Sequence, residues 1–151
     1  MKNEITKIKV GKSNAYQIGR MIEDVCDKYN LHNYFGLIST AVAQATEMAF
    51  YKLKDEDKLE FSFAQCIGGM SFALLSESNV FADLDFNQDI AQSNDHETPE
   101  SLIKVLTNEV YVLEEGKGLE MVFYVNGIEM NQLQNRQSKF KNYFLKTLIQ
   151  N

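Results

Sequence analysis

Two glycine-containing turns place the strongest constraint on how this 151-residue chain can fold. The first is Gly68-Gly69, and the second is Glu115-Gly116-Lys117-Gly118. Each lies between two short segments that are apolar throughout or alternate between apolar and polar residues, a pattern typical of β-hairpins. The chain is therefore expected to build an antiparallel sheet. The predicted strands are 5–10, 59–63, 70–75, 110–112 and 119–125.

Helical spacing of apolar residues accounts for the segments between these strands. One predicted helix is capped by Ser13 and runs to about Tyr29, a second covers residues 37–53, and a third starts at Thr98-Pro99, where proline suits the first helical position. A fourth is predicted after the Asn126-Gly127 turn. The predicted apolar stripes are Ile18, Ile22, Val25, Cys26 and Tyr29; Leu37, Ile38, Ala41, Val42, Ala45, Ala49 and Leu53; Leu102, Ile103, Val105 and Leu106; and Leu133, Phe140, Phe144 and Leu148.

The order of these elements predicts an α+β fold. It reads β–α–α–β–β–loop–α–β–β–α, which suits a two-layer sandwich. We expect a mostly antiparallel sheet of about five strands covered on one face by helices, plus a C-terminal helix. The length fits a single domain over 1–151, with a core at 4–125 and a C-terminal turn and helix at 126–151.

Composition limits the cellular compartment and the class of partner that we expect. The formal charge is −6 with a pI near 4.9, and this acidity disfavours nucleic acid as a partner. The apolar runs are too short for a membrane span, and residues 1–10 lack the apolar stretch of a signal peptide. Cys26 and Cys66 are too few for a disulfide framework, so we expect a reduced, cytoplasmic protein.

The middle of the chain lacks the residues that usually bind phosphate. From Leu59 to Ile103 there is no lysine or arginine, and from Met70 to Glu115 there is no glycine. Glycine backbone lets amide groups approach a phosphate closely, and cations offset its charge. Bound triphosphate is therefore disfavoured here. Eight acids occupy the cation-free window: Glu60, Glu77, Asp83, Asp85, Asp89, Asp95, Glu97 and Glu100.

Three features together carry a family resemblance. They are the element order over residues 4–124, the helix sequence Leu-Ile-Ser-Thr-Ala-Val-Ala-Gln-Ala-Thr-Glu-Met-Ala-Phe at 37–50, and the helix–strand sequence at 100–113. These resemble the ATPase domain shared by histidine kinases, gyrase and Hsp90, most closely the small bacterial anti-sigma-factor serine kinases. The resemblance implies a histidine-kinase-like sandwich whose nucleotide lies between the second helix and the segment after the third strand.

The nucleotide motifs of that family are degenerate in this chain. The family has a glutamate, which acts as base, and four residues later an asparagine that binds magnesium; the matching positions here are Gln44 and Met48. Glutamine takes no proton at neutral pH, and a thioether is a poor ligand for magnesium. The region matching the Asp-x-Gly-x-Gly motif, residues 75–81, has no glycine, and Glu77 is its nearest carboxylate. The lid region, 94–101, also lacks glycine.

We therefore expect a regulatory protein–protein interaction module without catalysis or cofactor. The resemblance implies a partner surface on the first helix, with a transcription factor, a signalling factor or a second copy of the chain as partner. That surface comprises Tyr16, Arg20, Glu23, Asp24 and Asp27. The alternative is a serine kinase that binds Mg-ATP through divergent motifs, using Gln44, Glu47 and Glu77. There Glu47, three residues after Gln44, would supply the carboxylate.

Three other patterns resemble sites. Residues 83–94 place oxygen side chains as a calcium loop does, but Gln88 replaces the turn glycine and Asn94 the bidentate acid, so a solvated acidic loop is favoured. His32, His96 and Cys66 lack metal or nucleophile spacing. Residues 136–146 carry four cations on the predicted C-terminal helix, which we expect to cover its own sheet or a dimer seam rather than a membrane.

Overall fold

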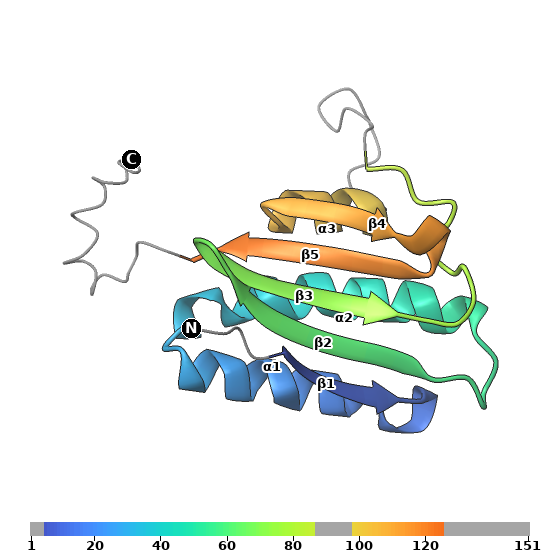
Figure 1. Ribbon diagram of the computed structural model, residues 1–151, viewed down its shortest axis with the longest axis horizontal. Helices are drawn as coiled ribbons and strands as arrows, with labels where there is room; N and C mark the ends of the chain where they lie inside the picture. The colour runs from blue at the N-terminus through green and yellow to red at the C-terminus, as the bar shows by residue number, and fades with distance from the viewer. Residues whose placement is uncertain (1–4, 87–97, 126–151) are drawn as a thin grey trace.

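The computed structural model describes residues 5–86 and 98–125, and within these ranges it has an α+β fold (Figure 1). Five strands and three α-helices follow one another in the predicted order, which confirms the expected fold class for this part of the chain. The Asn126-Gly127 turn and the C-terminal helix lie outside the described residues. The elements are β1 (Ile5–Val10), α1 (Tyr16–Lys28), α2 (Phe35–Lys52), β2 (Leu59–Cys66), β3 (Gly69–Leu75), α3 (Pro99–Leu106), β4 (Glu109–Leu113) and β5 (Gly118–Tyr124).

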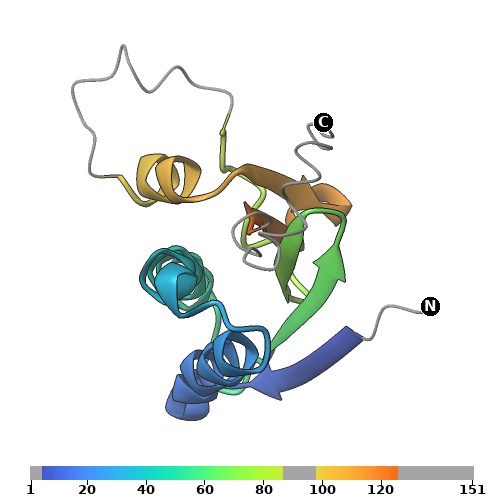
Figure 2. The ribbon, with the colours of Figure 1, turned by 90° about the vertical axis from the view of Figure 1, so that its left-hand side faces the viewer.

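The sheet is open and antiparallel throughout, with strand order β1-β2-β3-β5-β4. Both predicted hairpins are confirmed, since Cys66 lies opposite Gly69 between β2 and β3, and Leu113 lies opposite Gly118 between β4 and β5. Figure 2 shows all three α-helices on one side of the sheet. In the described part of the chain, no helix covers the other side.

The helix α1 buries the stripe that its sequence predicts. Ile18, Ile22, Val25 and Cys26 face the core. Its start differs from the prediction, because Ser13 does not cap it. Residues 12–14 form a 3₁₀ turn in which the backbone N–H of Gly11 donates to Asn14 Oδ1 at 2.7 Å, and α1 begins at Tyr16. The asparagine side chain therefore stabilises this connection.

The helix α2 buries a stripe of apolar residues beside the sheet. Ile38 and Val42 pack with three alanines, Ala41, Ala45 and Ala49, all fully buried. Alanine side chains let a helix backbone approach its neighbours closely. Thr46 is polar and buried, but its hydroxyl donates to the Val42 carbonyl at 2.7 Å, so no donor is left unpaired there.

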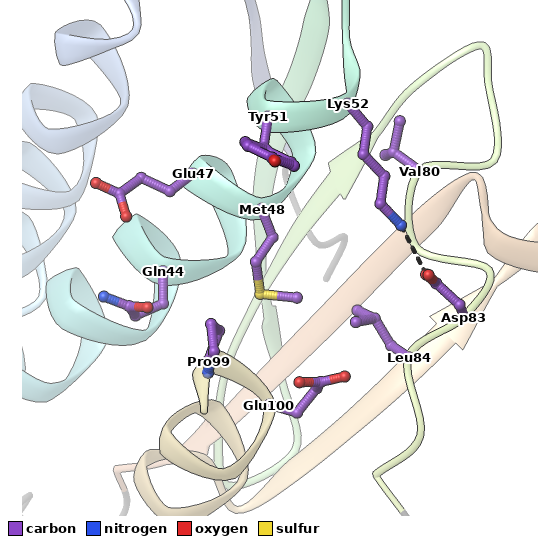
Figure 3. A pocket seen from close by; sticks show the side chains of 10 residues that line it. All are labelled: Gln44, Glu47, Met48, Tyr51, Lys52, Val80, Asp83, Leu84, Pro99 and Glu100. Atoms are coloured by element: carbon purple, nitrogen blue, oxygen red, sulfur yellow. Dashed lines mark hydrogen bonds and ion pairs between the residues drawn. The ribbon is translucent and has the colours of Figure 1, made fainter. Parts of the chain in front are cut away.

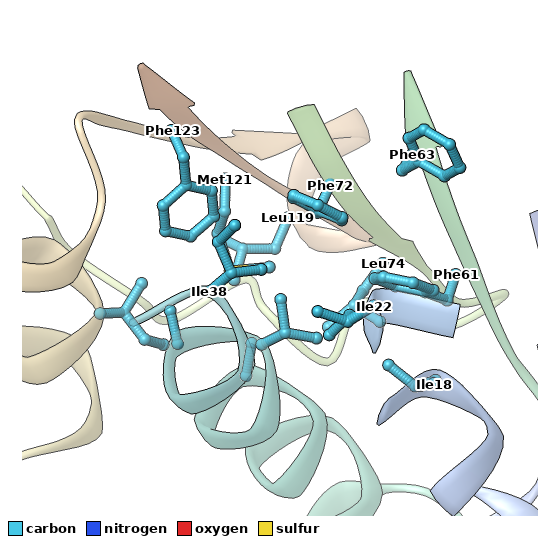
Figure 4. Packing of buried hydrophobic residues seen from close by; sticks show 14 of the residues in the cluster. Ile18, Ile22, Ile38, Phe61, Phe63, Phe72, Leu74, Leu119, Met121 and Phe123 are labelled. Atoms are coloured by element: carbon cyan, nitrogen blue, oxygen red, sulfur yellow. The ribbon is translucent and has the colours of Figure 1, made fainter. Parts of the chain in front are cut away.

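Phenylalanines from neighbouring strands form the centre of the core (Figure 4). The ring of Phe72 on β3 lies 5.9 Å from that of Phe61, 6.1 Å from that of Phe63 and 5.8 Å from that of Phe123. Aromatic pairs at such distances add about 0.5–1.5 kcal/mol beyond their buried area. Phe72 therefore connects β2, β3 and β5 beneath the helices.

The segment after β3 is held against the β4–β5 turn. Ser76 N–H donates to the Lys117 carbonyl, and Phe81 N–H donates to the Gly116 carbonyl, both at 2.8 Å. Gly116 has φ +102° and lies so close to Ala82 that a Cβ would fall 2.5 Å from the Ala82 Cα, so only glycine suits this position. Phe81 is fully buried, which fixes the segment on the core.

The helix α3 starts as predicted but buries a different stripe. Thr98 caps it and Pro99 occupies its first turn. Ile103 is fully buried as expected, whereas Val105 is 66% exposed and Ser101 is buried instead. The prediction was wrong for Val105 because α3 lies at one end of the helix layer, where it packs against α2 (Figure 2).

Candidate functional site

A cavity of about 380 Å³ opens between α2, the segment after β3 and the start of α3 (Figure 3). This volume is within the range of small-molecule pockets, about 300–1,000 Å³. It lies where the resemblance places a nucleotide. Its lining comprises Gln44, Glu47, Met48, Tyr51 and Lys52 of α2, Val80, Asp83 and Leu84 of the segment, and Pro99 and Glu100 of α3.

Helical spacing on α2 brings its lining residues together. Gln44, Met48 and Tyr51 are four and three residues apart, so they share one face of the helix. In Figure 3 the Met48 side chain extends from α2 toward Leu84 and Glu100. Met48 and Leu84 are half-buried and pack against the core. The centre of the cavity is therefore apolar.

The charged residues of the cavity are mostly acidic. Glu47, Asp83 and Glu100 line it with Lys52, which is the one cation among the described lining residues. Lys52 Nζ lies 2.7 Å from Asp83 Oδ1 in an ion pair. The hydrogen bond from Lys52, with a backbone hydrogen bond and the ammonium charge, lowers the pKa of Asp83 below its ordinary value. The cation is thus already engaged by a carboxylate.

The N-terminus of α3 also faces the cavity, but its first turn offers little to an anion. Exposed N–H groups and the helix dipole make such ends attractive to phosphate. Here Pro99 has no N–H, Ser101 N–H donates to Thr98 Oγ1 at 3.1 Å, and Glu100 adds a negative charge. Leu102 N–H also donates within the turn, to the Thr98 carbonyl, so few donors of this helix end remain for an anion.

Two of the three predicted nucleotide-motif residues line the same cavity, and the third lies elsewhere. Gln44 and Met48 both line the cavity, as does Glu47 of the alternative interpretation. Glu77 instead lines a second groove of about 790 Å³ between the β1–β2 edge and the segments after α2 and β3. Lys52 is the residue common to both sites. Glu77 is therefore not brought together with Gln44.

Sequence reasoning did not anticipate the second groove. It is polar, and its charged lining residues balance one another. The clue in the sequence is the polar cluster at 54–58, which directly follows the second predicted helix. The cations of the groove are Lys9, Lys52, Lys54 and Lys58, and its acids are Glu56, Asp57, Glu60 and Glu77.

All five predicted partner-binding residues lie on the exposed side of α1. The Arg20 guanidinium lies 5.9 Å from the centre of the Tyr16 ring, within cation–π range, and Tyr16 is 63% exposed. Asp27 Oδ1 is 3.6 Å from His32 Nε2 just beyond the helix. Glu23 and Asp24 add two more exposed carboxylates. We call this face the α1 surface.

The other candidate residues form no catalytic or metal group in the described ranges. No cluster of three or more metal-ligating side chains occurs there. Partial desolvation of the Cys66 thiol, with the charges of Glu120 and Glu109, raises its pKa, although the residue as a whole is exposed. A nucleophile needs the opposite shift. Of the calcium-like loop 83–94, only residues 83–86 are described.

No protein-family model matches the sequence, and no curated protein matches it. Among the described residues, no helix combines the length and the apolar character needed to cross a membrane.

Proposed function

We propose that this chain is a regulatory protein–protein interaction module on a histidine-kinase-like ATPase scaffold that neither binds ATP nor catalyses phosphoryl transfer. One observation carries the proposal. The described lining of the cavity between α2 and α3 carries a thioether, three carboxylates and one lysine, and that lysine is ion-paired. A magnesium–triphosphate complex needs hard oxygen ligands and free cations around its phosphates.

The arrangement of elements supports the scaffold. Two helices separate β1 from β2, and a helix separates the β2–β3 hairpin from the β4–β5 hairpin. The three α-helices of the described residues lie on one face of the antiparallel sheet. This is the layout that the resemblance to anti-sigma-factor kinases implies, with the cavity at its expected place.

The α1 surface supports the interaction function. It combines an exposed aromatic ring with the carboxylates of Glu23, Asp24 and Asp27 beside the edge strand β1. Aromatic residues are enriched at interfaces, and charged rims steer association. The fitting partner is a protein, such as a transcription or signalling factor, that presents an apolar socket with basic residues around it.

Calorimetry with Mg-ATP tests the loss of the nucleotide site. We expect no heat of binding at millimolar Mg-ATP, because the repulsive carboxylates are not offset by free cations. Binding in the micromolar range overturns the proposal.

A separate experiment identifies the partner. A photo-crosslinking residue placed at position 16 captures the bound protein in the native cell.

A titration with the identified partner tests the α1 surface. We expect Tyr16→Ala to weaken binding about tenfold or more, as truncation of a buried aromatic anchor does. Tyr51→Ala is the matched control, since Tyr51 is 90% exposed but lies on α2. Equal loss in both variants, or none in Tyr16→Ala, contradicts this role for the α1 surface.

The second candidate is an ATP-dependent serine kinase with divergent motifs. It is favoured by the cavity volume and by the presence of both Gln44 and Glu47 on its lining. In that case Glu47 would act as the base, and Glu47→Gln would abolish phosphorylation while Mg-ATP binding remains. The same calorimetric titration distinguishes the two functions.

A further inference from the structure

The sheet face opposite the helices is bare in the described part of the chain. The strand register defines this outer face. Ser62 opposes Ala73 and Ala64 opposes Ser71, at positions that alternate with the buried Phe61, Phe63 and Phe72. Figure 2 shows α1, α2 and α3 all on the other side. The inner face of the sheet is therefore covered by helices, whereas no helix of the described residues covers the outer face.

Small side chains occupy the centre of the outer face. Ser62, Ala64, Ser71 and Ala73 occupy its middle, on β2 and β3. Two tyrosines stand beside them, Tyr111 on β4 and Tyr124 on β5, and these are 47% and 44% exposed. Small residues let a helix approach a sheet closely, and exposed tyrosines offer apolar contact at its sides.

The outer face near β5 carries negative charge. Glu120 lies opposite Ala73 and Tyr111, and its Oε2 accepts a hydrogen bond from Ser71 Oγ at 2.5 Å. The Glu109 carboxylate accepts one from the Tyr111 hydroxyl. A segment that docks here would bring cations to these carboxylates.

We propose that residues 126–151 of this same chain fold back as an amphipathic helix that covers the outer face. Leu133, Phe140, Phe144 and Leu148 repeat at helical spacing and would form its apolar stripe. At 100° per residue, Arg136 and Lys141 fall on opposite sides of that stripe. The segment holds four cations and one acid, whereas the rest of the chain is acidic, so the charges are complementary.

The length of residues 126–151 and their attachment to the end of β5 suit a helix that covers the outer face. The segment begins directly after β5, whose seven residues span about 23 Å at about 3.3 Å per residue. A helix from Leu133 to Leu148 has 16 residues and extends about 24 Å at about 1.5 Å per residue. The chain between Tyr124 and Leu133 is long enough for the reversal, so the helix would run back along β5 and β3.

Hydrogen exchange on the full-length chain tests the proposal. We expect the amides of residues 136–146 to exchange at least about tenfold slower in the wild type than in an Ala73→Glu variant, which would place a charge beneath the docked helix. Ala43→Glu is the matched control, because Ala43 is exposed on α2, away from the outer face. It should retain the slow exchange.

A second variant keeps the test decisive if Ala73→Glu unfolds the sheet. Phe140→Glu changes only the segment itself, and we expect it to restore fast exchange at 136–146 and to increase the rate at which Ellman's reagent labels Cys66. Fast exchange in the wild type overturns the proposal. So does slow exchange that depends on protein concentration with a dimeric mass in light scattering, which would indicate a second copy, or slow exchange only with phosphatidylglycerol vesicles.

Discussion

Lys52 and Asp83 form the one direct charge contact across the cavity lining in the described structure. Their 2.7 Å pair joins the end of α2 to the segment after β3. Because the hydrogen bond from Lys52 lowers the pKa of Asp83 in the folded state, the pair stabilises the fold at pH values above the unfolded pKa. This contribution is lost as the pH falls through the folded pKa. It is small, since both side chains are exposed to solvent.

We predict that the pKa of the Asp83 carboxyl lies below its ordinary value, because Lys52 donates a hydrogen bond to it. Lys52→Met should raise the pKa of Asp83, because the variant removes both the donor and the positive charge. Carbon-detected NMR of the side-chain carboxyl measures the midpoint. Lys54→Met is the matched control and should leave the midpoint in place. An unchanged midpoint in Lys52→Met would show that the pair does not form in solution.

The Lys52–Asp83 pair is a contact that could not be predicted from the sequence. Lys52 and Asp83 are 31 positions apart, and no pattern in the sequence pairs them. The window from Leu59 to Ile103 has acids and no cations, but the fold supplies cations from other segments: Lys52 of α2 pairs with Asp83, and Lys7 of β1 pairs with Glu60. Sequence distance hides such contacts because the fold brings distant segments together.

At the scale of elements, α3 differs most from what its sequence indicates. Its apolar residues cover more of its circumference than the fold buries, because α3 lies at one end of the helix layer. Ile103 is fully buried, and Val105, two positions away, points to solvent. The helix therefore offers a comparison of two apolar residues in one short element.

We predict that Ile103→Ala lowers the free energy of unfolding by about 2–5 kcal/mol, because it removes buried methyl groups and leaves a cavity. Val105→Ala is the matched control, and its effect should stay within about 0.5 kcal/mol. Urea titrations followed by circular dichroism measure both. Equal losses would mean that another surface, outside the described residues, covers Val105.

Most elements could be predicted from the sequence because their periods are clear. Alternation and the two glycine turns determine the hairpins, and the stripe from Ile18 to Cys26 determines the inner face of α1. The cavity could not be derived in this way. Gln44 and Met48 follow from helix spacing, but their meeting with Leu84 and Glu100 depends on how α3 packs on α2.

At the scale of the whole molecule, one continuous apolar core joins the described elements. Its buried residues come from α1, α2, α3 and from β1, β2, β3 and β5. Phe72 lies at its centre, in ring contact with β2 and β5. A core that no boundary divides should unfold in a single cooperative transition.

We predict that Phe72→Ala lowers the free energy of unfolding by about 3–5 kcal/mol, as truncation of a buried aromatic does. Far-UV circular dichroism and tyrosine fluorescence should report the same shifted midpoint in urea, because loss of packing at Phe72 affects every layer at once. Tyr51→Ala, with its ring 90% exposed, should change the free energy of unfolding by no more than about 0.5 kcal/mol. Two separate midpoints would show that the helix layer and the sheet unfold independently, and a small effect of Phe72→Ala would place the centre of the core elsewhere.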